Sequence, residues 1–175
     1  CEQPLNIYGH SKLAFDQYVR SRLKDIDSLV VGLRYFNVYG PGEQHKGRMA
    51  SVVWHLYTQM QLDETLRLFG ASHGYDSGEQ QRDFVYIDDV IIVTRWWAEQ
   101  PPSNSGIYIC GTGSAETFNV VAKAVLEWYG RGQIEYIDFP SDLEMAYQPY
   151  TRADLSRLRQ IGYLGEFRPV ADGVR

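Results

Sequence analysis

Hydrophobic positions along the chain change repeatedly from helical spacing to short continuous runs. Between Tyr8 and Ile26, apolar side chains recur every three or four residues, which predicts a helix that begins near Pro4. After a polar turn, the continuous apolar stretch from Leu29 to Leu33 predicts a buried strand of a parallel sheet. A helix followed by a buried strand is half of a crossover unit, so an α/β fold is expected.

The rest of the chain repeats this alternation. Helices are predicted over residues 49–62, from 88 or 89 through 97, over 119–129 and in a last segment ending at 162. Strands are predicted over residues 66–69, 83–87, 106–109 and 134–137. Asp88 or Asp89 is expected to cap the helix that ends at residue 97, and Thr151 with Asp154 to form a capping box for the last helix. Polar loops are predicted over 42–47 and over 70–81, the second being long enough to suggest a function.

Composition and charge then exclude several functions. The 175 residues carry a net charge of −5 without a basic cluster, which argues against a nucleic-acid partner. Apolar runs such as residues 90–93 are far too short to span a bilayer. With two cysteines and no metal-ligand spacing among the four histidines, neither a disulfide framework nor a metal site is predicted. The chain starts at Cys1 without a methionine, so we expect it to be a piece of a longer protein.

Tyr8 and Lys12 lie four positions apart on the first predicted helix and therefore share one face. A phenol is a poor base near neutral pH, and a nearby ammonium favours its ionised form. Such a pair suits acid–base chemistry at a carbon that carries a hydroxyl. Taken alone, however, the spacing is better explained by a packed tyrosine beside a solvated lysine.

The glycine-rich segment 111–116 follows a predicted strand and precedes a helix, as a dinucleotide-binding loop does. Its third glycine is replaced by Glu116, which would place a carboxylate near a pyrophosphate. We therefore interpret this segment as a structural turn. We also interpret Cys110 as a small core residue and the pair Trp96-Trp97 as core packing.

Three segments occur in a characteristic order: Tyr8-Gly9-His10-Ser11-Lys12, then residues 34–42 (RYFNVYGPG), then residues 82–90 (RDFVYIDDV). Together they resemble the extended short-chain dehydrogenase/reductase family, whose members act on nucleotide-linked sugars with a bound nicotinamide cofactor. The resemblance covers essentially the whole chain. It implies the C-terminal part of a Rossmann-like doubly wound sheet plus a small α/β substrate-binding subdomain. Residues 1–47 would be the remaining Rossmann side and active-site loop, and residues 48–175 mostly the substrate-binding subdomain with interspersed Rossmann-side elements.

Residues 42–51, 132–140 and 147–148 are similar to a narrower group within that family. Its members invert carbon six of ADP-glycero-manno-heptose, which supplies heptose for the lipopolysaccharide core. The likeness implies transient oxidation of that carbon by a bound cofactor, expected to be NADP with NAD as an alternative, and return of the hydride to the other face. It also implies a cytoplasmic homo-oligomer whose substrate is ADP-heptose.

Residue roles follow from the same resemblance. Tyr8 and Lys46 would be the two catalytic acid/base groups, and Lys12 and the Val38 backbone would contact the cofactor. The substrate contacts implied are Asn37, Arg48, His55, Phe69, Gly70, Ala71, Ser72, Arg82 and Tyr147. Arg82 suits a diphosphate because a guanidinium can bind it with two hydrogen bonds.

From the residues alone, several of these roles have plainer explanations. A loop lysine such as Lys46 is usually a solvated charge, and as a base it would need desolvation or a nearby cation. Arg82 could form an ion pair with Asp83 or Asp88 instead. His55 and Tyr147 could simply be packed amphipathic side chains.

Two other functions remain alternatives to the heptose epimerase. One is another nucleotide-sugar epimerase, dehydratase or reductase of the same family. The other is a folded substrate-binding fragment that is inactive as it stands.

Overall fold

The computed structural model describes residues 3–4, 6–99, 104–141, 143–144 and 147–174. The elements in chain order are α1 (Ile7–Arg22), η1 (Leu23–Asp25), β1 (Val31–Tyr35), β2 (Asn37–Tyr39), η2 (Gln44–Met49), α2 (Val52–Leu62), β3 (Thr65–Phe69), β4 (Gln81–Arg82), β5 (Phe84–Tyr86), α3 (Ile87–Glu99), β6 (Gly106–Cys110), β7 (Glu116–Thr117), α4 (Phe118–Tyr129), β8 (Gln133–Ile137), α5 (Ser156–Gln160) and α6 (Val170–Gly173). Within this part of the chain, no helix is long and apolar enough to cross a membrane.

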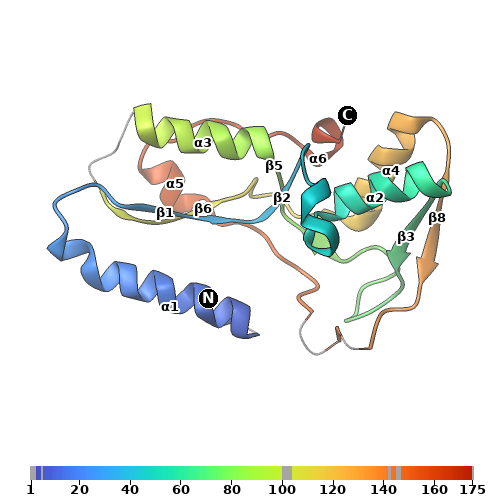
Figure 1. Ribbon diagram of the computed structural model, residues 1–175, viewed down its shortest axis with the longest axis horizontal. Coiled ribbons are helices and arrows are strands. Elements are labelled where there is room, and N and C mark those ends of the chain that lie inside the picture. The colour runs from blue at the N-terminus through green and yellow to red at the C-terminus, as the bar shows by residue number, and fades with distance from the viewer. Residues whose placement is uncertain (1–2, 5, 100–103, 142, 145–146, 175) are drawn as a thin grey trace.

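Among the described residues, three of the four strand pairs are parallel: β1 with β6, β2 with β5, and β3 with β8. The fourth, β4 with β7, is antiparallel. Strands β1 and β2 form a nearly continuous extended segment that changes partner at Phe36. The Phe36 amide donates to the Cys110 carbonyl, and the next amide, of Asn37, donates to the Asp83 carbonyl. One segment therefore joins two strand pairs along the middle of the molecule (Figure 1).

Helices lie on both sides of this segment. In Figure 1, α1 and α3 flank β1 and β6 from opposite sides, while α2 and α4 lie together near β3 and β8. Parallel strands covered by helices are the arrangement that the alternating pattern predicted, so the α/β class is confirmed.

The buried side chains form two hydrophobic clusters. The first is centred on α2, β3 and α4 and includes Tyr39 and Phe84, whereas the second is centred on α3 and β6 and includes Val85. Successive side chains of a strand point to opposite faces. Strands β2 and β5 therefore lie between the two clusters, with Tyr39 and Phe84 facing one and Val85 and the half-buried Val38 facing the other.

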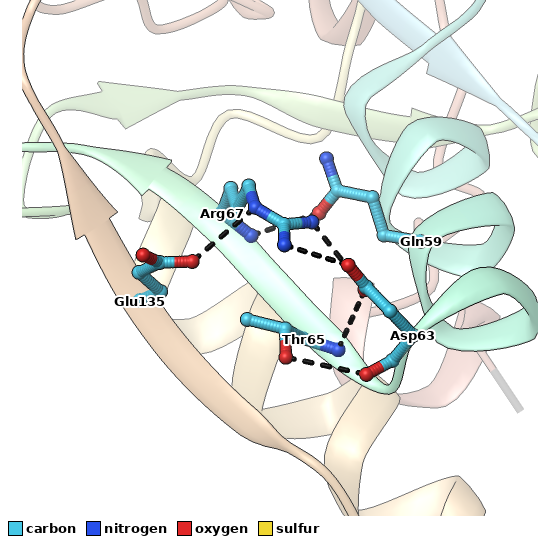
Figure 2. A network of polar contacts seen from close by, with 5 residues as sticks. All are labelled: Gln59, Asp63, Thr65, Arg67 and Glu135. Carbon is cyan, nitrogen blue, oxygen red and sulfur yellow. Dashed lines mark hydrogen bonds and ion pairs between the residues drawn. The ribbon is translucent and has the colours of Figure 1, made fainter.

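A polar network fastens the outer end of α2 to β3 and β8 (Figure 2). The Arg67 guanidinium contacts the Asp63 carboxylate at 2.6 Å and the Glu135 carboxylate at 3.2 Å, and its backbone amide donates to Gln59 Oε1 at 2.8 Å. These contacts hold the end of the helix against two neighbouring strands.

The long elements agree with the sequence pattern, including the expected core positions of Cys110 and the Trp96-Trp97 pair. Cys110 is fully buried, and the two indole rings lie 5.3 Å apart at their centroids beside the second cluster. The loop expected over residues 42–47 contains the short helix η2 instead, and α2 begins at Val52, where the Ser51 side chain accepts from the Trp54 amide.

Both predictions of helix caps are wrong. Helix α3 already begins at Ile87, so Asp88 and Asp89 lie in its first turn, and the Asp89 carboxylate accepts from the Arg168 amide instead. The last helix of the predicted region begins only at Ser156, whose amide and hydroxyl both donate to Asp154. The Thr151 hydroxyl is buried without a hydrogen-bond partner, so no capping box forms.

Candidate active site

A cavity of about 280 Å³ lies against β2 and β5, beside η2 and the N-terminal ends of α2 and α4. Four of the predicted site residues line it together: Asn37, Val38, Lys46 and Arg82. Its other lining residues are Glu43, Met49, Ala50, Ser51, Val52, Phe84 and Phe118. The structure thus brings the predicted Lys46 loop and the predicted Arg82 strand to one place.

Asn37 and Val38 reach the cavity because β2 passes beneath it. The Asn37 side chain donates from Nδ2 to the Asp83 carbonyl at 3.0 Å, which fixes the amide and leaves its carbonyl oxygen as an acceptor. The parallel pairing of β2 with β5 sets this position, since Asn37 lies opposite Phe84 in the register.

Lys46 lies in η2 and is partly exposed, with 41% of its side chain accessible. Its Nζ is 3.3 Å from Oε2 of Glu43, a carboxylate that is only 3% exposed. Glu43 also accepts hydrogen bonds from the Ser51 amide at 2.8 Å, the Ser51 hydroxyl at 2.6 Å and the Gly40 amide at 3.2 Å. Burial raises the pKa of Glu43, but the hydrogen bonds from Ser51 and Gly40 and the charge of Lys46 outweigh it, and the net pKa is lowered.

Arg82 is held between two aromatic rings. Its guanidinium carbon lies 4.8 Å from the centroid of the Tyr147 ring and 5.9 Å from that of Phe118, and one of its nitrogens donates to the Gln81 carbonyl. Burial lowers the pKa of Arg82, and the nearby Tyr147 opposes this. Among the residues that the structure describes, no carboxylate forms an ion pair with Arg82, so its charge is available to an anion.

Tyr147 connects the cavity to a second group of aromatic side chains. Its ring lies 4.9 Å from Phe139 and 5.6 Å from His73, and Phe139 in turn lies 5.1 Å from Phe69. Burial raises the pKa of Tyr147, although the Arg82 charge lowers it in part. The predicted substrate residue Phe69 is therefore linked to Arg82 through ring contacts rather than directly.

The turn over residues 70–72 follows β3 and is fastened by Gln80, a fully buried side chain. Its Nε2 donates to the Gly70 carbonyl at 3.0 Å and to Ser72 Oγ at 2.9 Å. Ala71, between them, is exposed. The turn is thus rigidly attached to β4, the strand that carries Arg82.

Tyr8 and Lys12 lie near each other on α1, as the spacing predicted. The Lys12 ammonium is 5.1 Å from the centroid of the Tyr8 ring, and 71% of Tyr8 is exposed. Neither residue is among the described residues that line the cavity, and neither are Arg48, which is exposed, or His55, which is half-buried on α2. The catalytic and binding roles expected for these four residues stay predictions.

Backbone amides of the glycine-rich turn after β6 donate hydrogen bonds to a side chain of the protein itself. The buried Asp83 carboxylate accepts hydrogen bonds from the Thr112 amide at 2.7 Å, the Gly113 amide at 2.8 Å and the Ala153 amide at 3.0 Å. The Thr112 and Gly113 amides of this turn are thus already hydrogen-bonded to Asp83. This agrees with the interpretation of segment 111–116 as a structural turn.

Sequence reasoning missed Glu43 and Asp83. Asp83 gave a signal, since a charged residue directly before a buried strand must find partners when it is buried. Glu43 gave almost none, because a glutamate in a glycine-rich turn is usually solvated. Its contact with Lys46 places an acid where the sequence suggested that a nearby cation was needed.

Comparison with known proteins identifies the family. Residues 1–111, more than half of the chain, match the NAD dependent epimerase/dehydratase family. The chain belongs to that family. One relative of this chain is ADP-L-glycero-D-manno-heptose-6-epimerase from Alkalilimnicola ehrlichii, 56% identical over 174 residues, which are 99% of this chain and 54% of the relative. The predicted resemblance to heptose epimerases is therefore confirmed.

Solved structures of other family members agree. ADP-L-glycero-D-manno-heptose-6-epimerase from Helicobacter pylori is 33% identical with a TM-score of 0.82, and the match covers 99% of this chain and 50% of that protein. MoeE5, solved with UDP-glucuronic acid and NAD, is 25% identical with a TM-score of 0.78, covering 98% and 54%. These likenesses confirm the Rossmann-like α/β class. This family member spans about half the length of the relatives it matches.

Proposed function

We propose that the protein inverts carbon six of an ADP-linked glycero-manno-heptose, and that Tyr8 and Lys46 exchange protons with the hydroxyl of that carbon. The proposal rests first on the 56% identity to a heptose epimerase. Because this chain spans 54% of that relative, the activity is proposed for the intact protein that carries it. Heptose for the lipopolysaccharide core is the product we propose, and a cytoplasmic homo-oligomer is the form that the family resemblance suggests.

The single observation that carries the proposal is the cavity shared by Lys46, Asn37 and Arg82. Arg82 would hold the diphosphate, since its buried charge lies between two rings without a carboxylate partner among the described residues. Asn37 would hold a sugar hydroxyl with its free carbonyl oxygen. The turn over residues 69–72 and Tyr147 would bind the rest of the nucleotide sugar, with Arg48 and His55 at its edge.

The donors of α1 fit a nicotinamide nucleotide. Tyr8 is largely exposed, and the Lys12 ammonium lies 5.1 Å from its ring centre, so a phenol and a cation can reach one ribose. Val38, whose backbone we propose to contact the cofactor, lines the cavity. When bound, the cofactor would accept a hydride from the sugar carbon and later return it. MoeE5 was solved with NAD, so NAD is the first cofactor to test and NADP the second.

If the aldehyde group rotates within the site while the cofactor stays in place, its oxygen lies on opposite sides before and after, so we propose one proton acceptor and one proton donor. Tyr8 would remove the hydroxyl proton on its side. Lys46 would return a proton to the oxygen once the intermediate has rotated within the site.

The test is an assay of the intact protein with ADP-heptose deuterated at carbon six, followed by NMR in the presence of NAD or NADP. We expect both epimers to form with the deuterium retained. Lys46→Met is expected to lower the inversion rate about a hundredfold or more, and Tyr8→Phe likewise. Lys123→Met, which removes an exposed lysine on α4, is the matched control and should leave the rate unchanged.

Normal inversion in Lys46→Met would contradict the two-base assignment. Turnover of UDP-sugars in place of ADP-heptose would instead identify a different epimerase or dehydratase of the family.

A further inference from the structure

We infer that Glu43 is a positioning residue for Lys46, and that it holds the lysine side chain as an ammonium ion at the cavity so that Lys46 enters the reaction as the proton donor. This inference rests on the function proposed above for Lys46. It assigns a role to a buried carboxylate that the proposed chemistry does not otherwise use.

The geometry of Glu43 supports this role. The carboxylate is 3% exposed, yet it lies in a loop that is otherwise open to solvent. A buried carboxylate is tolerated only when it is paired and hydrogen-bonded. Glu43 satisfies both conditions, with three hydrogen bonds from Ser51 and Gly40 and an ion pair with Lys46 at 3.3 Å.

The hydrogen bonds fix where the carboxylate lies. Gly40 directly follows β2 and Ser51 directly precedes α2, so both ends of the intervening loop are anchored to one carboxylate. Lys46 lies between them in η2. Its side chain is therefore paired with an anchored carboxylate at 3.3 Å, and Lys46 lines the cavity.

Glu43 is the charged group in direct contact with Lys46. Arg82 lines the same cavity and carries a positive charge. Lys46 also has His45 and Arg48 as near neighbours in η2, both exposed. Glu43 lies in direct contact and is buried, so its effect is less screened than those of the exposed groups.

The proton balance follows directly. In the direction that starts at Tyr8, the phenolate takes the hydroxyl proton from the sugar carbon. After the intermediate has rotated within the site, the oxygen takes a proton from the Lys46 ammonium. The resulting amine stays hydrogen-bonded to Glu43. One proton has then moved from substrate to Tyr8 and one from Lys46 to product. Proton exchange with solvent returns both residues to their starting state.

The first test measures the charge of Lys46 without any substrate. The intact protein is treated at pH 8 with an amine-acylating reagent, which reacts only with neutral amines, and labelling of each lysine is followed by peptide mass spectrometry. In Glu43→Gln we expect Lys46 to be labelled roughly three- to tenfold faster than in the wild type. Lys24 and Lys123, both exposed and distant in sequence, are internal references whose labelling should not change.

The second test separates positioning from folding. Glu43→Gln should lower kcat roughly tenfold or more with little change in KM, because the proton donor is misplaced while the substrate contacts remain. Glu43→Asp, which keeps the charge, should recover part of the rate. Adding Glu43→Gln to Lys46→Met should cause no further loss, since the carboxylate acts only through the lysine.

The matched control is Ser51→Ala, which removes one hydrogen bond to Glu43 and the cap of α2 but leaves the charge pair. It should lower the melting temperature without accelerating Lys46 labelling. Equal labelling of Lys46 in Glu43→Gln and in the wild type would overturn the inference, as would an unchanged kcat. Should Glu43→Gln not fold, Glu43→Asp takes its place, and faster labelling is again expected because the shorter carboxylate is drawn away from Lys46.

The outcome is distinguishable from failure of the proposed function. Inversion that persists in Lys46→Met contradicts the function, whereas the labelling comparison still decides whether Glu43 holds the ammonium. Inversion that is lost in Lys46→Met but normal in Glu43→Gln contradicts the inference alone.

Discussion

Gly47, the residue that follows Lys46, adopts a backbone conformation that other residues avoid. Its φ is 53° and its ψ is −125°, inside η2. No atom lies within 4 Å of the position that a Cβ would occupy, so backbone strain rather than a clash is the reason for glycine here. The residue reverses the chain between Lys46 and the N-terminal end of α2.

We predict that Gly47→Ala lowers the free energy of unfolding by about 1–3 kcal/mol or rearranges the loop. In either case the rate of inversion should fall, because Lys46 is displaced. Urea unfolding and kcat of the intact protein measure the two effects. Gly130→Ala is the control, since Gly130 also has a positive φ of 67° with open space but caps α4. It should lose stability while keeping kcat, and an equal loss of kcat in both variants would contradict the prediction.

At the scale of elements, Asp83 joins three segments that are far apart in the sequence. It directly precedes β5, and its carboxylate accepts from the turn after β6 and from Ala153, before α5. Because the carboxylate is fully buried and its partners are all donors, no neutral side chain reproduces this arrangement. Asp83 therefore fixes the second cluster's strands to the segment that leads into α5.

We predict that Asp83→Asn lowers the free energy of unfolding by about 2–4 kcal/mol, because an amide nitrogen would face backbone amides and leave them without an acceptor. Urea denaturation of the purified protein measures the loss. Asp88→Asn is the matched control, since Asp88 is exposed in the first turn of α3, and it should cost less than about 1 kcal/mol. Equal stability of Asp83→Asn and the wild type would refute the role assigned to this carboxylate.

Periodicity predicted α3 and α4 well, because each buries a face that repeats along the sequence. It also predicted α1 as a helix, although Tyr8 and Phe15, which carry that pattern, are largely exposed. It failed at helix ends, where hydrogen bonds depend on local geometry. Asp89 was expected to cap α3, yet it accepts from Arg168, which is distant in sequence and brought near only by the fold. Periodicity also could not show that the loop over residues 44–49 coils into a helical turn.

The site shows the same division. Segment similarity indicated Lys46, Asn37 and Arg82, and the structure places all three around one cavity. Segment similarity could not indicate Glu43. The role of this residue depends on contacts with Gly40, Lys46 and Ser51 that exist only after the loop has folded. The ring contacts that hold Arg82 likewise join residues from three separate segments.

At the scale of the whole molecule, the reactivity of Cys110 reports whether the second hydrophobic cluster is closed to solvent. The thiol is fully buried on β6, and burial, with smaller contributions from Asp83 and Asp89, raises its pKa to about 12. Thiolate is the reactive form, so both access and ionisation protect this residue.

We predict that Cys110 in the native protein reacts with iodoacetamide at pH 8 at least about a hundredfold more slowly than in denaturant. The peptide that contains Cys110 is quantified by mass spectrometry after timed labelling. The same peptide labelled in guanidinium at the same pH is the reference. Rapid labelling without denaturant would mean that the second cluster opens readily.

The change of partner at Phe36 has a consequence for how the molecule loses its structure. A single extended segment pairs with β6 through β1 and with β5 through β2, and the faces of β2 and β5 belong to different clusters. Loss of either cluster would leave the other with an unpaired strand edge, which favours aggregation. Because each half would lose strand partners that the other half supplies, we expect unfolding to be a single cooperative transition.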